Sequence, residues 1–193
     1  MKQFCSSFVL KEKIMKNLHL ILLLLVMISG SMIAQTQFHD FVVKDIDGKD
    51  FTFAQLKGKK VMVVNVASKC GLTPQYEKLE ALYKQYGGDK FVIIGFPANN
   101  FLHQEPGTDA EIKSFCTLEY GVSFPVMSKI SVKGDDQHAL YKWLTTKSIN
   151  GFEDSEVSWN FQKYLIDENG HISKVISPKT SPMDAEIIDW LTK

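Results

Sequence analysis

Two spacings of apolar residues recur along this chain, one typical of strands and one typical of helices. The apolar run from Val61 to Val66 predicts a strand that is covered on both faces, and Lys90 to Phe96 predicts a second one. Apolar residues recur at helical spacing in Pro74 to Tyr86, between these strands, and in Asp109 to Glu119, after the second. Because helices separate the strands, we expect the two strands to pair in parallel.

Further elements are predicted on either side of this unit. Alternating residues in Phe38 to Lys44 and in Phe51 to Phe53 predict an opening β-hairpin around the turn from Asp45 to Asp50. The C-terminal half predicts a strand near Val126 to Ile130, a helix from Gln137 to Thr146, two antiparallel strands around Asp167 to Gly170, and a last helix opened by Ser181 and Pro182. The pattern therefore predicts an α/β protein with a central mixed β-sheet flanked by helices.

The N-terminus follows a different pattern. Lysines precede an apolar run from Leu18 to Ile28, and small residues follow as far as Ala34. This order predicts a signal peptide over residues 1–34, with Met15 as an alternative start, and a folded domain over residues 35–193. We therefore expect an exported protein, in the bacterial periplasm.

Two alternatives for this leader stay open. Cleavage after Ser31 competes with cleavage near Ala34, because Met32 is larger than the cleavage site prefers at that position. An uncleaved membrane anchor is the other alternative, since the stretch from Leu18 to Ala34 approaches the shortest length that spans a bilayer.

Composition limits the classes of function. The chain has 193 residues, of which 45% are hydrophobic and 23% charged, and this suits one globular domain after a leader. A formal net charge of +0 argues against a nucleic-acid surface, which needs clustered basic charge. Three cysteines without CxxC spacing and five scattered histidines argue against a zinc or haem site.

Cys70 is the strongest candidate for chemistry. It follows the predicted strand Val61 to Val66, and Thr73 and Pro74 are predicted as the N-cap and first position of the next helix. The partial positive charge at a helix N-terminus favours a thiolate over a thiol, so a cysteine in this place is a candidate nucleophile. The alternative is a buried structural cysteine, because free cysteines are often fully buried.

Three segments, in this order, carry a family resemblance. They are VNVASKCGLT from Val64 to Thr73, GFPANNFLHQEPG from Gly95 to Gly107, and SWNFQKYLID from Ser158 to Asp167. Each resembles a motif of the glutathione peroxidase family, and the resemblance extends from about Phe38 to the C-terminus. It implies a thioredoxin-like fold and a thiol peroxidase that reduces hydrogen peroxide and organic or lipid hydroperoxides to water and alcohols. It implies no cofactor.

The resemblance also assigns roles to single residues. Cys70 occupies the place of the peroxidatic cysteine or selenocysteine, and Gln104, Trp159 and Asn160 match the other members of a catalytic tetrad. Amide and indole N–H groups are uncharged donors that can stabilise a thiolate and the oxygen anion leaving the peroxide. Outside their motifs, such residues would usually be ordinary surface or core residues.

Cys116 falls where thioredoxin-dependent members carry the resolving cysteine. A nearby thiol can condense with a cysteine sulfenic acid to form a disulfide, which prevents further oxidation. The alternative is a packed helix cysteine, because Ile112, Phe115 and Cys116 share one apolar face of a helix capped by Thr108 and Glu111. Both roles are compatible in turn if local unfolding brings Cys116 to Cys70.

Two departures from the family pattern refine these expectations. Many members have cysteine and glutamine where this chain has Ala98 and Asn100, so Cys116 is the only resolving candidate in the domain. All 22 Lys+Arg residues are lysines, and lysine does not replace the planar fork with which arginine binds anions such as glutathione. The expected reductant is therefore a thioredoxin-like protein, with glutathione less suitable. The short segment between Trp143 and Trp159, compared with that of tetrameric members, predicts a monomer.

Two other functions use the same first residue. A thiol-disulfide oxidoreductase is one rival, since Cys70 to Thr73 spells CxxT where thioredoxins have CxxC, although the second cysteine is missing. A redox sensor that passes oxidation to a partner protein is the other.

Overall fold

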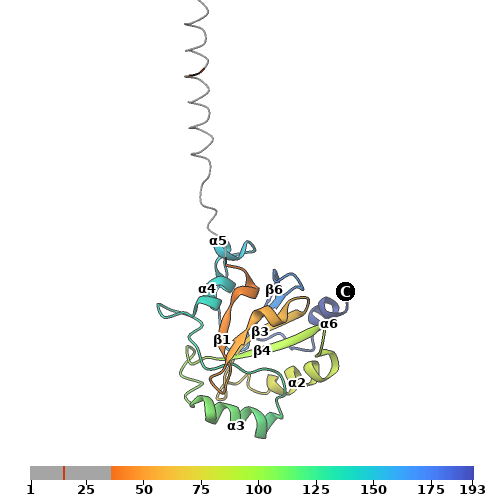
Figure 1. Cartoon of the computed structure of the whole chain (residues 1–193). Helices are drawn as coiled ribbons and strands as arrows, with labels where there is room; N and C mark the ends of the chain where they lie inside the picture. The colour runs from red at the N-terminus through yellow and green to blue at the C-terminus, as the bar shows by residue number, and fades with distance from the viewer. Residues whose placement is uncertain (1–14, 16–35) are drawn as a thin grey trace, which may run out of the picture. The chain divides into compact units, whose positions relative to one another are not determined.

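The computed structural model describes Met15 and residues 36–193 of the chain (Figure 1). The chain divides into two units, Met1–Gln35 and Thr36–Lys193, and every element named below lies in the second. The predicted signal peptide falls, apart from Met15, outside the described residues. Within the described part of the chain, no helix is both long and apolar enough to cross a membrane.

A mixed four-stranded sheet forms the centre of the domain. Its strands are β3 (Lys60–Val66), β4 (Phe91–Pro97), β5 (Lys163–Ile166) and β6 (Ile172–Ile176), in the order β4-β3-β5-β6. Strand β3 pairs in parallel with β4 and antiparallel with β5, which pairs antiparallel with β6. The predicted parallel pair and the predicted late antiparallel pair are both confirmed, and the fold is α/β and thioredoxin-like.

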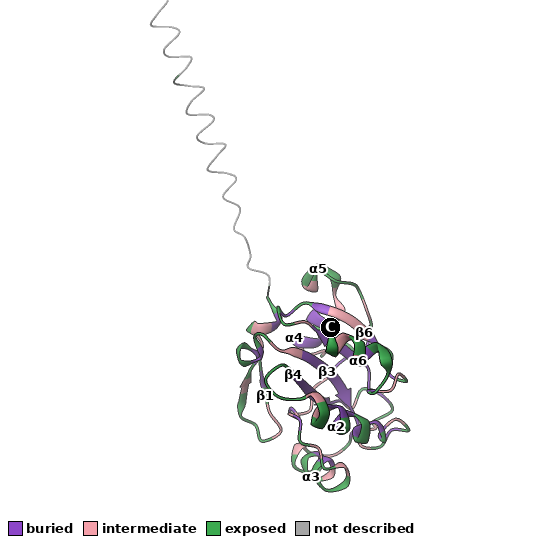
Figure 2. Ribbon diagram, turned by 90° about the vertical axis from the view of Figure 1, so that its right-hand side faces the viewer, coloured by how far each residue is buried: buried purple, intermediate pink, exposed green. Residues whose placement is uncertain are grey.

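Helices and loops cover both faces of this sheet (Figures 1 and 2). Side chains alternate along a strand, so Val61 and Val63 of β3 point to one core cluster and Met62 and Val64 to the other. The first cluster is closed by α4 (Ala139–Thr145). The second is closed by α2 (Gln75–Tyr86), α3 (Asp109–Tyr120) and α6 (Ala185–Thr192). Because both faces are covered, β3 and β4 are almost completely buried.

The predicted opening hairpin is shorter than expected. Its strands are β1 (Val42–Lys44) and β2 (Asp50–Thr52), which pair antiparallel. The 3-10 helix η1 (Phe38–Asp40) precedes it and the 3-10 helix η2 (Phe53–Leu56) follows it, where the alternating pattern predicted strand. Phe38 is fully buried in the core, so its apolar position reflects packing of a helical turn instead of a strand face.

Two predictions for the C-terminal half are wrong. Residues 126–130 form no strand, because Val126 bridges to Gly95 and Met127 bridges to Asp45, so neither ladder continues. The last helix begins at Ala185 instead of Ser181, since the Asp184 side chain caps it by accepting the N–H of Glu186 at 3.0 Å.

The helix predicted from Gln137 is confirmed with a later start. Helix α4 begins at Ala139, and the His138 side chain accepts the N–H of Leu140 as its N-cap. A further short helix, α5 (Lys147–Asn150), follows it.

Candidate active site

Cys70 lies in the tight turn that joins β3 to α2. Its own N–H donates to the Thr73 hydroxyl at 2.9 Å, and that hydroxyl donates to the Ala67 carbonyl at 2.9 Å. The N–H of Leu72 donates to the Cys70 sulfur at 3.4 Å. The turn therefore holds the thiol at the carboxyl end of a central strand, with a backbone donor directed at it.

The start of α2 differs from the prediction. Pro74 is the N-cap and Gln75 the first helical residue, without a side-chain capping bond. Thr73 was predicted as that cap, but its hydroxyl is engaged with Cys70 and Ala67 inside the turn. The Thr73 hydroxyl does lie next to the start of the helix, as predicted. It bonds to residues that precede it in the chain instead of to the helix that follows.

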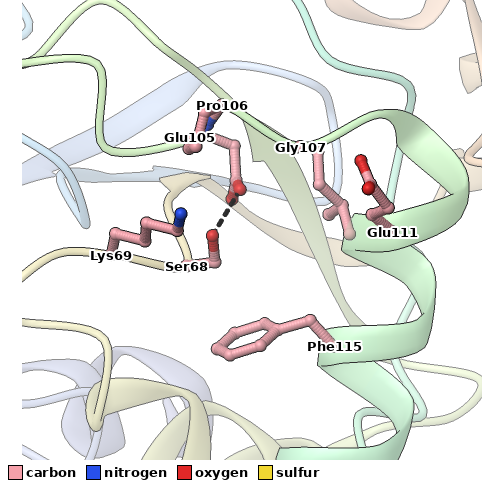
Figure 3. Close-up of a pocket in the computed structure, with 8 residues that line it drawn as sticks. Ser68, Lys69, Glu105, Pro106, Gly107, Glu111 and Phe115 are labelled. Carbon is pink, nitrogen blue, oxygen red and sulfur yellow. Dashed lines mark hydrogen bonds between the residues drawn. The ribbon is translucent and has the colours of Figure 1, made fainter.

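The loop after β4 is clamped onto the Cys70 turn. The N–H of Lys69 donates to the Gln104 carbonyl at 3.0 Å, and the Ser68 hydroxyl donates to the Glu105 carboxylate at 2.6 Å (Figure 3). Two consecutive residues of the turn are thus held by two consecutive residues of the loop. Gln104 is fixed against the residue that directly precedes Cys70.

Asn160 completes this arrangement from the loop before β5. It is fully buried, and its side-chain amide donates to the Gln104 side-chain carbonyl at 2.9 Å. Trp159 is half-buried, and its ring lies 5.4 Å from that of Phe101 in tilted contact. The structure thus brings Gln104 and Asn160 together and ties Gln104 to the turn of Cys70. Among the described residues, only Leu72 donates a hydrogen bond to the Cys70 sulfur.

Cys116 lies on the inner face of α3. It is 2% exposed, and its thiol donates to the Tyr76 hydroxyl oxygen at 3.5 Å. Burial raises the pKa of Cys116 to about 11, and the nearby Glu105 carboxylate also raises it. Cys70 and Cys116 are both free thiols and belong to the same buried cluster. The predicted apolar face of α3 and its Thr108–Glu111 capping box are confirmed.

A family model for glutathione peroxidase matches residues 38–145, more than half of the chain. Glutathione peroxidase-like peroxiredoxin 2 of Saccharomyces cerevisiae is 48% identical over 160 residues, which cover 82% of this chain and 99% of that protein. The chain belongs to the glutathione peroxidase family.

Two further comparisons agree with this assignment. Thioredoxin/glutathione peroxidase BtuE of Escherichia coli is 42% identical over 167 residues, covering 77% of this chain and 91% of that protein. The crystal structure of Trgpx in its apo form is 39% identical, covers 83% of this chain and 98% of that chain, and superposes with a TM-score of 0.63. The protein is therefore a peroxidase, an oxidoreductase of the glutathione peroxidase family.

Two fully buried charged side chains of this glutathione peroxidase, Glu105 and Lys163, lie beside the Cys70 turn or at the start of α2 and were not predicted from the sequence. Glu105 is fully buried, burial raises its pKa, and one of its carboxylate oxygens has no hydrogen-bond partner among the described residues. Its carboxylate borders a cavity of about 380 Å³ between the Cys70 turn and α3 (Figure 3). The sequence did show that Glu105 is a charged residue within the motif from Gly95 to Gly107, but only the fold shows that its side chain is buried.

Lys163 is the second. It is fully buried on β5, and its ammonium donates to the Gln75 side-chain carbonyl at 2.7 Å and to the carbonyls of Pro178 and Thr180. Burial without a carboxylate partner lowers the pKa of Lys163 to about 7. Lys163 therefore fastens the first residue of α2, just after the Cys70 turn, to the sheet.

No group of three or more histidine, cysteine or acidic side chains among the described residues could hold a metal ion.

Proposed function

We propose that this protein is a thiol peroxidase in which Cys70 reduces hydrogen peroxide and organic or lipid hydroperoxides. The Cys70 thiolate attacks one peroxide oxygen and the O–O bond breaks. The leaving hydroxide or alkoxide takes up a proton, which gives water or an alcohol and leaves Cys70 as a sulfenic acid.

The observation that carries the proposal is the clamp around the Cys70 turn. A backbone N–H is directed at the sulfur, and Gln104, joined to Asn160, is held against the neighbouring Lys69. Uncharged donors grouped around a thiol can stabilise both the thiolate and the departing oxygen anion. We propose that Gln104, Trp159 and Asn160 supply these donors once the peroxide is bound.

Cys116 is proposed to complete the cycle. Its thiol condenses with the Cys70 sulfenic acid, which forms a disulfide and releases water. A thioredoxin-like dithiol then reduces this disulfide by thiol–disulfide exchange. Two observations favour this reductant over glutathione. All 22 Lys+Arg residues are lysines, and one relative at 42% identity is named a thioredoxin/glutathione peroxidase.

Thr73 argues against the rival thiol-disulfide oxidoreductase. It occupies the position of the second cysteine of thioredoxins. Its hydroxyl accepts the N–H of Cys70 and donates to the Ala67 carbonyl, which stabilises the turn. A hydroxyl cannot form the disulfide on which that reaction depends.

A single assay tests the proposal. Purified protein is mixed with hydrogen peroxide and a lipid hydroperoxide, and consumption is followed with thioredoxin and its reductase or with glutathione and its reductase. We expect turnover with both peroxides and at least tenfold faster turnover with thioredoxin. No peroxide consumption with either reductant would contradict the proposed function, whereas faster turnover with glutathione would overturn only the choice of reductant.

We also propose that residues 1–34 are removed on export to the periplasm and that the mature domain is a monomer. The lysine-rich start, apolar run and small residues of the leader support export. Intact-mass measurement of protein from the native host tests the cleavage, and a full-length membrane-bound form would favour the anchor. Light scattering of the purified mature domain tests the monomer.

A further inference from the structure

We propose that Asn65, an amide within central strand β3, is a positioning residue that fixes the Trp159–Asn160 turn next to Cys70. The inference rests on the proposed function, because it concerns how Trp159 and Asn160 are held for that reaction. Asn65 is the one polar residue in the run from Val61 to Val66 that predicts this strand.

Three hydrogen bonds connect Asn65 to this turn. Its side-chain amide donates to the Trp159 carbonyl at 3.0 Å, its backbone carbonyl accepts the N–H of Phe161 at 2.6 Å, and its backbone N–H donates to the Gln162 carbonyl at 3.4 Å. The regular pairing of β3 with β5 ends before this point, at Val64 and Lys163. Asn65 therefore extends the pairing beyond the regular ladder, where the chain runs from the turn into β5.

The turn needs such a support because its backbone is strained. Phe161 has a φ of 69°, in the left-handed region that bulky side chains rarely adopt. Phe161 is fully buried, and its ring packs edge-to-face on Tyr76 with centroids 5.5 Å apart. Its N–H points at the Asn65 carbonyl, so the strained residue is pinned at both its side chain and its backbone.

The Asn65 side chain is less favourable for the stability of the fold than an apolar side chain would be. It is fully buried, and its carbonyl oxygen has no hydrogen-bond partner among the described residues. An unsatisfied buried amide oxygen carries a desolvation cost that an apolar side chain would avoid. Val61 and Val63 occupy the same face of the strand in the ordinary apolar manner. The amide is explained by its one donated bond, which holds the Trp159 carbonyl.

The held turn continues into the active site. Asn160 lies between Trp159 and Phe161, which both bond to Asn65. Its side chain donates to Gln104, and the Gln104 backbone carbonyl accepts the N–H of Lys69 next to Cys70. The connection thus starts on β3, passes through the turn and the Gln104 loop, and returns to the segment that follows β3. Displacing the Trp159 carbonyl would move Asn160 and, through it, Gln104.

The test compares Asn65→Ala with Val63→Ala, a matched control on the same face of the same strand that removes buried side-chain atoms at a position paired with Tyr164 of β5. Single-turnover oxidation of Cys70 is measured by rapid mixing with hydrogen peroxide, thiol alkylation and mass spectrometry. We expect Asn65→Ala to oxidise about 10- to 100-fold more slowly and Val63→Ala within about twofold of the parent. Equal rates in Asn65→Ala and the parent, at temperatures where both are folded, would overturn the proposal.

A double variant separates positioning from a direct effect. If Asn65 acts through Asn160, then Asn65→Ala combined with Asn160→Ala is no slower than Asn160→Ala alone. If the double variant instead loses the product of the two single-variant rate reductions, Asn65 acts by another route. If Asn160→Ala itself does not slow oxidation, the proposed role of Asn160 fails, and that failure is distinguishable from failure of the Asn65 inference.

A second variant and a spectroscopic signature keep the test decisive if Asn65→Ala does not fold. Asn65→Ser retains a small polar side chain, and its shorter reach should also lose the bond to Trp159. The indole N–H signals of the three tryptophans are recorded by NMR and assigned with Trp159→Phe. We expect the Trp159 signal to shift while the Trp143 and Trp190 signals stay in place. An unshifted Trp159 signal in a folded Asn65 variant would contradict the proposal.

Discussion

Cys70 and Cys116 share one buried cluster of the core, yet their sulfur atoms lie in different elements and have different hydrogen-bond partners. The Cys70 sulfur lies in a turn and accepts the N–H of Leu72 at 3.4 Å. The Cys116 sulfur lies within a helix and donates its own proton to Tyr76, and burial raises its pKa to about 11. Depth does not separate them, since the residues are 8% and 2% exposed. What separates them is the partner at sulfur, which is a backbone N–H within a turn for Cys70 and the Tyr76 hydroxyl beside a helix for Cys116.

The two segments also differ in how they are held. The Cys70 turn is clamped by Ser68 and Lys69 to the Gln104 loop, and neither bond depends on the other thiol. Helix α3 has the Thr108–Glu111 capping box at its start and Gly121 in the left-handed conformation at its C-cap, and Ile112 and the Lys113–Asp47 ion pair hold its middle. A helix can open from an end when a cap is weakened, whereas the Cys70 turn is tied by two bonds to a second segment. The proposed disulfide therefore requires local opening of α3, whereas the Cys70 turn stays in place.

The largest expected effect comes from replacing Cys70, the first of the two thiols compared. Cys70→Ser should lower peroxide consumption by at least about three orders of magnitude, because a serine hydroxyl stays protonated and is a weak nucleophile. Cys116→Ser should leave single-turnover oxidation of Cys70 within about twofold, since Cys116 acts only after the O–O bond is broken. Stopped-flow peroxide consumption measures both. Substantial turnover in Cys70→Ser would remove the whole assignment.

The next effect concerns the second half of the cycle. Cys116→Ser should abolish thioredoxin-driven cycling and drive Cys70 to sulfinic acid under repeated peroxide exposure, because no thiol intercepts the sulfenic acid. Mass spectrometry of peroxide-treated parent and variant reads out the disulfide and the sulfinic acid. A parent protein with sulfinic Cys70 and Cys116 still free would return Cys116 to a packing role.

A smaller effect tests whether Cys116 becomes accessible through local opening of α3. Gly121→Ala should make Cys116 about fivefold more reactive toward an alkylating agent, because a left-handed alanine at the C-cap costs about 1 kcal/mol and favours opening of α3. Gly151→Ala is the matched control. It introduces the same strain at the C-cap of α5, also without a steric clash, and should leave Cys116 reactivity unchanged. Equal reactivity in the parent and both variants would show that Cys116 becomes accessible by another motion.

The last effect is on stability instead of activity, and it is a pH dependence at the start of α2. Burial lowers the pKa of Lys163 from its ordinary 10.5 to about 7, so above pH 7 the unfolded chain binds more protons there than the folded one. The free energy of unfolding should therefore gain a positive contribution as pH rises from 7 toward 10.5. Urea unfolding of the parent and of Lys163→Met measures it, and the variant should lose this contribution.

The window of that measurement is set by Cys116. Its raised pKa, about 11 against an ordinary 9.0, gives a contribution of opposite sign between pH 9 and 11, so Lys163 is best measured between pH 7 and 9. The exposed Lys78→Met is the control for loss of a lysine. The same pH slope in the parent and in Lys163→Met would contradict a lowered pKa.

The local pattern of the sequence determined the sheet and the place of the reactive turn. Continuous apolar runs predict strands covered on both faces, and intervening helical stretches require parallel pairing of β3 and β4. Cys70 follows from this, since the turn after a central strand is fixed once the strand is. The motifs added Gln104, Trp159 and Asn160, of which the structure joins Gln104 to Asn160 by a direct hydrogen bond.

Only the tertiary structure decided what the polar side chains inside the core do. Thr73 had a hydroxyl suited to cap α2, and Asn65, Glu105 and Lys163 had no pattern that marked them as buried. Their partners lie from 37 to 94 positions away in the chain for the bonds Ser68–Glu105, Gln75–Lys163 and Asn65–Trp159. Hydrophobic periodicity is a property of neighbours along the chain, whereas the partner of a buried polar group is set by which segments the fold brings into contact.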